Sequence, residues 1–111
     1  MIQHLNEYKT RLQLATILRK PDRKVRKRIE ELRKQGHKIY SNPSGKGYKL
    51  ATTEKEENEL FRTYASRIES EAETLRRMFG NDKVRNFLMK QIIIINEEEK
   101  WLNQTTTYQT H

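Results

Sequence analysis

Basic residues are concentrated in one short stretch of this chain, where their spacing suits the binding of a polyanion. Seven of the twelve residues from Arg23 to Lys34 are lysine or arginine. Residues 1–53 hold 14 Lys and Arg against 4 Asp and Glu, a net charge of +10, whereas residues 54–111 hold 9 against 11, a net charge of −2. Ammonium and guanidinium groups bind phosphate oxygens, and an arginine can donate two hydrogen bonds to a guanine. This segregation of charge predicts a polyanion-binding surface in the first half of the chain.

Residues that would support catalysis or metal binding are not arranged for either chemistry. The chain has no cysteine, which excludes disulfides, thiolate zinc sites and thiol nucleophiles. Its three histidines are scattered without the spacing of metal ligands. Four glutamates stand together at the start of a predicted helix, where they favour the helix dipole: Glu54, Glu56, Glu57 and Glu59. We therefore expect no enzyme activity, no metal and no other cofactor.

The basic stretch lies in the second of two predicted helices that are joined by a short turn. Thr10 suits the N-cap of the first helix. Lys20-Pro21-Asp22 separates the two helices, because a proline disfavours helical geometry in the residue before it. The apolar residues of the first helix are expected to form its inward stripe: Leu12, Ala15, Ile17 and Leu18.

The second predicted helix, Asp22 to Gln35, has one apolar side and one basic side. Val25, Ile29 and Leu32 lie within about 60° of one another on a helical wheel, so they are expected to face the core. The basic residues occupy the other directions and are expected to face solvent. Gly36 follows at the position where a left-handed residue commonly ends a helix.

A two-stranded hairpin is predicted after this helix. Two short segments alternate in polarity, and Ile39, Tyr48 and Leu50 are expected to point inward. The tip between them, Pro43-Ser44-Gly45-Lys46-Gly47, suits contact with a phosphate backbone or a minor groove. We interpret Tyr40 and Tyr48 as packing residues rather than as platforms for stacked bases.

Four motifs follow one another in this part of the chain: Leu14-Ala15, Lys20-Pro21-Asp22, Ile29-Glu30-Glu31-Leu32-Arg33-Lys34-Gln35-Gly36 and Gly45-Lys46-Gly47-Tyr48-Lys49-Leu50. In this order they resemble the winged helix-turn-helix family, most closely the type at the N-terminus of the biotin-operon repressor. Residues 11–50 are also similar to the winged module of MerR-type regulators, in which helices after the wing lead to an antiparallel dimer element. Such domains usually begin with an additional helix, for which only residues 2–8 are present here, so later helices are expected to close the core.

The second half of the chain is predicted to form two long helices in a helical hairpin. Thr53-Glu54-Lys55-Glu56 is a capping box for the first helix, and Gly80 separates the two. The first helix carries a heptad-like seam: Phe61, Tyr64, Ile68, Leu75 and Met78. The second carries one broad apolar face: Val84, Phe87, Leu88, Ile92 and Ile95.

The run Ile92-Ile93-Ile94-Ile95 would be apolar around the whole circumference of a helix, so one side of a neighbour cannot cover it. It favours a homodimer over two alternatives, in which the run completes the core or forms a β-strand. An apolar content of only 33% also favours self-association. The residues expected at the dimer interface are Phe61, Ile68, Leu75, Phe87, Leu88, Ile92 and Ile95.

We expect a mainly α chain with a small β-hairpin wing, in which a winged helix-turn-helix is followed by a C-terminal helical hairpin. Residues 1–53 are assigned to the winged helix-turn-helix, residues 54–103 to the hairpin, which completes the core or forms the dimer, and residues 104–111 to a polar, disordered tail. No apolar stretch is long enough for a signal peptide or a bilayer span, so a cytoplasmic protein without membrane attachment is expected.

The motifs and the resemblance together favour a small sequence-specific DNA-binding protein, a transcriptional regulator or a replication accessory factor of the kind that phages and mobile elements encode. Its second helix would enter the major groove of duplex DNA. Three residues at the outward N-terminal positions of that helix are expected to contact bases: Arg23, Lys24 and Lys27. Six others are expected to bind phosphates or form the wing contact: Arg19, Lys20, Arg28, Lys34, Lys46 and Lys49.

Two other functions fit the same residues. The first is a winged-helix protein-interaction module whose basic surface binds or inhibits an acidic, nucleic-acid-associated protein of a host. The second is RNA binding, which is disfavoured because no sheet with exposed aromatic residues is predicted.

Overall fold

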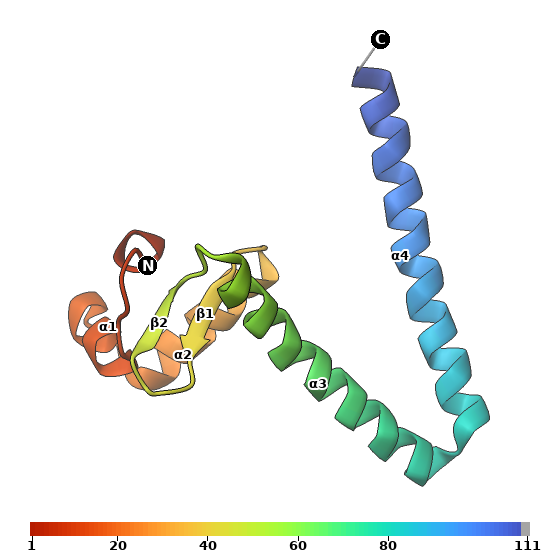
Figure 1. Cartoon of the computed structure of the whole chain (residues 1–111), viewed down its shortest axis with the longest axis horizontal. Helices are drawn as coiled ribbons and strands as arrows, with labels where there is room; N and C mark the ends of the chain where they lie inside the picture. The colour runs from red at the N-terminus through yellow and green to blue at the C-terminus, as the bar shows by residue number, and fades with distance from the viewer. Residues whose placement is uncertain (110–111) are drawn as a thin grey trace. The chain divides into compact units, whose positions relative to one another are not determined.

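The computed structural model describes the backbone of residues 1–109 and the side chains of residues 1–100. Within them the chain is mainly helical with one small antiparallel sheet, as expected (Figure 1). The elements in chain order are the 3-10 helix η1 (Ile2–His4), α1 (Arg11–Leu18), α2 (Asp22–Lys34), β1 (Ile39–Asn42), β2 (Gly47–Leu50), α3 (Glu54–Phe79) and α4 (Asn81–Gln109). They belong to two compact units, an N-terminal unit (Met1–Ser66) and a C-terminal unit (Arg67–His111).

Local signals set the ends of α1 and α2. The Thr10 hydroxyl accepts a hydrogen bond from the Gln13 backbone N–H (3.1 Å), and the Gln13 side chain accepts one from the Thr10 N–H (2.8 Å), which completes a capping box. After α2, Gly36 adopts a left-handed conformation (φ 99°), and the His37 N–H donates to the Leu32 carbonyl at 3.0 Å. The predicted helix start and the predicted stop at Gly36 are confirmed.

The core of the N-terminal unit joins both short helices to the first strand and to the leading segment. Its buried residues are Leu5, Leu14, Val25, Ile29, Leu32 and Ile39. The inward stripe predicted for α2 is confirmed. The stripe predicted for α1 is only partly right. Ala15 packs against the core, as predicted, but the buried residue of this helix is Leu14, and Leu12 (77% exposed) and Ile17 (43% exposed) face away from the core.

The leading segment closes this core, although η1 is only three residues long. Leu5 has no exposed surface, and Ile2 packs against the core. Backbone pairing to β2 holds the segment in place. The Leu50 N–H donates to the Leu5 carbonyl at 2.8 Å, and Lys9 and Tyr48 exchange two hydrogen bonds of 2.9 and 2.8 Å. The expectation that later helices close the core is therefore corrected.

The two strands form an antiparallel hairpin (Figure 1). Its inner face completes the core. Ile39 is paired with Leu50, and Ser41 with Tyr48. Ile39 is buried, and Tyr48 and Leu50 pack against the core, as predicted. Neighbouring positions on each strand point to the opposite face.

The first turns of α3 cover that opposite face. The predicted capping box is confirmed, since the Thr53 hydroxyl accepts from the Glu56 N–H (3.1 Å) and the Glu56 carboxylate accepts from the Thr53 N–H (3.2 Å). Tyr40 is buried here and donates its hydroxyl hydrogen bond to Glu59. That bond and the burial raise the pKa of Tyr40 to about 12. Tyr40 is therefore a packing residue, as predicted.

The C-terminal unit contains the rest of α3 and all of α4. Gly80 (φ 86°) stands between them, as its position in the sequence predicted. Residues 92–95 are helical, so the alternative that they form a β-strand is wrong. The backbone of residues 104–109, which were expected to lie in a disordered tail, continues α4 as a helix. Residues 110–111 lie outside the described residues.

Gly47 is the glycine that the fold of the N-terminal unit requires most. A Cβ at this position would lie 2.2 Å from the Lys9 carbonyl oxygen, at a φ of +104°. We expect Gly47→Ala to lower the free energy of unfolding by about 3 kcal/mol, measured by urea denaturation. Gly45→Ala is the matched control, because its φ is +86° but nothing lies within 4 Å of the added Cβ. It should cost only about 1–2 kcal/mol. Equal losses for the two variants would contradict the close approach of Lys9 to β2.

Candidate nucleic-acid interface

Every acidic side chain of α2 is already paired with an arginine of the same helix. The pairs are Asp22–Arg26 (3.0 Å), Glu30–Arg33 (3.0 Å) and Glu31–Arg28 (3.4 Å). Arg11 of α1 is a second partner of Asp22 at 3.4 Å. Exposed pairs of this kind contribute little to stability. They do, however, neutralise one another locally, so the acids of α2 do not offset its other basic residues.

Four basic residues of α2 remain without an acidic partner: Arg23, Lys24, Lys27 and Lys34. All four are exposed, and among the described residues none of them takes part in an ion pair or a side-chain hydrogen bond. Because Val25, Ile29 and Leu32 are buried on the other side of the helix, the rotation of α2 is fixed with these cations toward solvent. The three residues predicted to contact bases are thus brought together on one open face.

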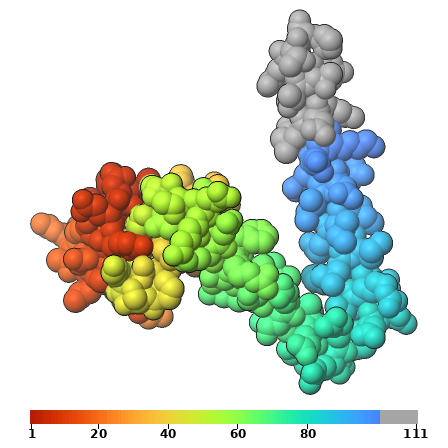
Figure 2. Space-filling model, viewed as in Figure 1, coloured from red at the N-terminus to blue at the C-terminus, as the bar shows by residue number. Residues whose placement is uncertain are grey.

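The turn and the wing tip add further cations beside α2. Arg19 and Lys20 lie in the α1–α2 turn, where Arg19 takes a left-handed conformation (φ 54°), and both are exposed. Lys46 is exposed on the wing tip, which belongs to the yellow surface of Figure 2. A depression of about 670 Å³ separates the turn from the tip and is lined by Lys20 and Gly45, among others. Arg11 also lines it, and the sequence prediction had missed Arg11.

Lys49 is turned away from this surface, contrary to its predicted role in phosphate binding. Its side chain is only 14% exposed, and its ammonium group lies 2.7 Å from the Glu56 carboxylate and 5.5 Å from the centre of the Tyr8 ring. It also donates to the Thr52 hydroxyl at 3.2 Å. The reason is strand alternation: Lys49 is paired with Tyr40 on the face of the hairpin that α3 covers. Lys49 therefore joins β2 to α3 and is not available to a phosphate.

No protein-family model, curated protein or solved structure matches this chain. In the described part of the chain, no helix combines the length and the apolar character that crossing a membrane requires. The same residues contain no group of three or more His, Cys, Asp or Glu placed to hold a metal ion.

Arg33 is an anchoring residue that the sequence prediction missed. Its guanidinium donates twice to the Ile39 carbonyl (3.1 and 2.7 Å) and once each to Glu30 (3.0 Å) and the Tyr64 hydroxyl (3.1 Å). The side chain is only 16% exposed. Arg33 therefore ties the end of α2 to β1 and α3, whereas the other basic residues of its helix lie on the surface. Only its spacing of three from Glu30 was visible in the sequence.

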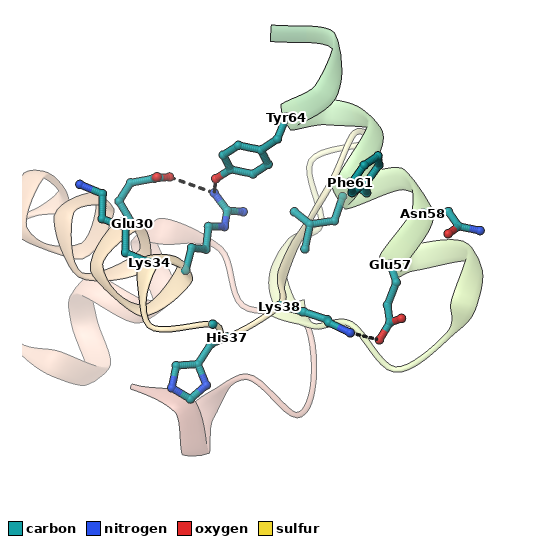
Figure 3. A pocket seen from close by; sticks show the side chains of 11 residues that line it. Glu30, Lys34, His37, Lys38, Glu57, Asn58, Phe61 and Tyr64 are labelled. Atoms are coloured by element: carbon teal, nitrogen blue, oxygen red, sulfur yellow. Dashed lines mark hydrogen bonds and ion pairs between the residues drawn. The ribbon is translucent and has the colours of Figure 1, made fainter. Parts of the chain in front are cut away.

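A mostly apolar groove of about 590 Å³ lies beside the C-terminal end of α2. Leu60, Phe61 and Tyr64 of α3 line one side, and the other side includes Lys34 and His37. Figure 3 shows Tyr64 reaching toward the end of α2 and Lys38 paired with Glu57 at the rim. Phe61 is 74% exposed, so a large aromatic ring stands open at this groove.

The residues predicted at a dimer interface fall into two places. Phe61 belongs to the groove of the N-terminal unit. The others lie in the C-terminal unit, where Leu75 is partly buried and the rest are exposed: Ile68, Phe87, Leu88, Ile92 and Ile95. None of them belongs to the core described above, so the alternative that the isoleucine run completes this core has no support from the described residues.

Because Lys49 is paired with Glu56, the free energy of unfolding is expected to vary with pH in the acidic range. Hydrogen bonds from Lys49, and from the Thr52 and Thr53 backbone, lower the pKa of Glu56 from 4.5 to about 2. Because the folded pKa is depressed, this stabilisation is present above pH 4.5 and is lost as the pH falls toward 2. We expect Glu56→Gln to lower the urea midpoint at pH 7, with the difference from the wild type shrinking between pH 4.5 and pH 2. Glu57→Gln, which removes only an exposed pair, is the control and should have little effect at any pH.

Proposed function

We propose that this protein is a small sequence-specific DNA-binding protein of the winged helix-turn-helix type. It would act in the cytoplasm as a transcriptional regulator or a replication accessory factor of the kind that phages and mobile elements encode. The observation that carries the proposal is the division of the basic residues of α2: Arg26, Arg28 and Arg33 have acidic partners, whereas those on the open face have none. Unpaired, exposed cations gathered on one side of a rigid helix are suited to a polyanion.

The order of the elements supports the winged helix-turn-helix assignment. Two helices joined by a short turn are followed by a hairpin, and Lys9, ahead of α1, pairs with β2 as a one-residue third strand. In this arrangement α2 would be the recognition helix and the tip around Lys46 the wing. The resemblance noted in the sequence implies the same roles.

We assign base contacts to the N-terminal half of α2 and phosphate contacts to its surroundings. Arg23, Lys24 and Lys27 would face the base edges in the major groove, where arginine can bind guanine with two hydrogen bonds. Phosphates would be bound by residues around them: Arg19, Lys20, Lys34 and Lys46. Arg28 can join these, because its pair with Glu31 is long (3.4 Å) and exposed. A phosphate backbone in the depression between turn and wing tip would also meet Arg11.

The proposal is tested by measuring affinity for duplex DNA against salt concentration, after selecting preferred sequences from a random pool. We expect log affinity to fall steeply and linearly with log salt, because phosphate contacts release counterions. Arg23→Ala should cost about 1–3 kcal/mol on the preferred sequence and relax the preference at one position. Lys46→Ala should weaken all sequences alike and reduce the salt slope by about 1.

Arg26→Ala is the matched control for these variants, since Arg26 lies on the same helix but is paired with Asp22. It should leave both the preference and the salt slope nearly unchanged. Affinity for duplex DNA that is weak and equal at low and moderate salt would contradict the proposal.

The groove at the end of α2 favours a second candidate function, that of a module that binds a host protein associated with nucleic acids. Its apolar side, with the open Phe61 ring, would take an apolar side chain of the partner, while Lys34 and His37 at the other side suit an acidic neighbour. We expect the wild type to retain a stoichiometric partner from nuclease-treated host lysate, and Phe61→Ser to lose it while keeping DNA affinity. Lys27→Ala should show the reverse. Retention of the same partner by Phe61→Ser would exclude the groove as its binding site.

A further inference from the structure

The apolar surface of α4 has no cover within the described chain. Ile92, Ile93, Ile94 and Ile95 are 51%, 55%, 49% and 62% exposed. Successive helical residues point 100° apart, so the four side chains face every direction around the helix. Phe87 (51%) and Met89 (52%) extend the exposed apolar surface toward the start of α4. A contiguous apolar surface of this kind on a charged chain marks a contact with another molecule.

The distribution of charges along α4 indicates that the contacting molecule is a second copy of this chain. Residues 81–90 carry three basic side chains and one acidic one, namely Lys83, Arg85, Lys90 and Asp82. Residues 91–100 carry three acidic side chains and one basic one, namely Glu97, Glu98, Glu99 and Lys100. The two halves therefore have net charges of +2 and −2, and the isoleucine run lies between the two clusters. A helix with this pattern is complementary to itself when reversed.

We infer that α4 pairs with α4 of a second copy of this chain in antiparallel orientation, with the two-fold axis near Ile92. In a two-fold interface, residue i of one copy contacts residue j of the other, and j contacts i. An axis near Ile92 sets Leu88 opposite Ile95 of the second copy. It also sets Arg85 opposite Glu98. Lys83 falls opposite Lys100 but next to Glu99, so the half of net charge +2 in each helix still lies along the half of net charge −2 in the other.

A parallel pair would lack this complementarity. In register, it would set Arg85 against Arg85 and each glutamate of the acidic cluster against its own copy, and like charges directly opposite one another repel. The side chains needed for the antiparallel pair are accessible. Arg85 is bound only to its neighbour Asp82 in an exposed pair (2.9 Å), and no ion pair of Glu98 is present among the described residues.

One partner helix covers only part of a run that is apolar on all sides. The same unit offers more apolar surface on α3, where Ile68 (63%), Met78 (63%) and Phe79 (55%) are exposed. Two copies would bring two such segments to the pair of α4 helices. The inference concerns the C-terminal unit alone and does not depend on the proposed binding of DNA.

The chain contains no cysteine, so single cysteines report the pairing without background. We would prepare full-length Arg85→Cys and Glu98→Cys proteins and treat each alone, and then an equimolar mixture, with a short bis-maleimide cross-linker. In the antiparallel pair, equal positions lie roughly 20 Å apart along the helix axis, since each residue rises 1.5 Å. We therefore expect covalent dimers in the mixture and few in either protein alone. Ser44→Cys, on the wing tip, is the control and should not cross-link.

Sedimentation of the wild type completes the test. We expect a mass twice the 13.4 kDa of one chain. A monomer at a concentration of 100 µM would overturn the inference. A dimer in which each single-cysteine protein cross-links to itself would show a parallel pair, and a dimer without cross-links in any sample would place the interface outside α4. Either result would also overturn the inference while leaving the DNA-binding proposal intact.

Discussion

The burial of the apolar side of α2 is the interaction on which the rest of the N-terminal unit depends. Val25, Ile29 and Leu32 are each at most 3% exposed, and full burial of such a side chain stabilises by about 1.5–3 kcal/mol. The ion pairs around the helix are mostly exposed, and each contributes at most about 1 kcal/mol. Burial therefore sets the rotation of α2, and the ion pairs only decide which cations stay unpaired once the rotation is set. The open basic face is a consequence of the core.

In the described residues, the leading segment closes this core without forming an α-helix. The Leu5 side chain fills this side of the core by itself. The backbone of residues 5–9 forms hydrogen bonds with β2 and does not form an α-helix. This attachment brings the backbone of Lys9 so close to Gly47 that no Cβ could be accommodated there. The glycine that the sequence pattern attributed to the wing thus also serves the attachment of the leading segment. The attachment, in turn, holds the wing beside α1.

Signals that act within one element could be predicted from the sequence, whereas contacts between one element and the next could not. The capping residues Thr10 and Thr53, the stop at Gly36 and the inward side of α2 depend on spacing within one or two turns, and all are confirmed. Lys49 was misassigned because its partner Glu56 lies across the boundary between strand and helix, where charge alone gives no direction. The stripe of α1 was misassigned at Leu12 and Ile17 because eight residues contain too few turns for a periodicity to be decisive.

The two proposed surfaces respond differently to salt, and this follows from what each is made of. On α2 the cations would bind a phosphate array, so each contact releases counterions and salt acts on the whole affinity. On α4 the charged clusters flank four isoleucines. Salt screens the charges but not the apolar contacts, so it would weaken the preference for the antiparallel over the parallel pair more than the association of the two copies. An increase in salt should therefore release DNA before it separates two copies. A second copy would present a second basic helix to the DNA and so enhance binding. The affinity for DNA would then fall steeply as the salt concentration rises, while the mass of the free protein stays that of a dimer.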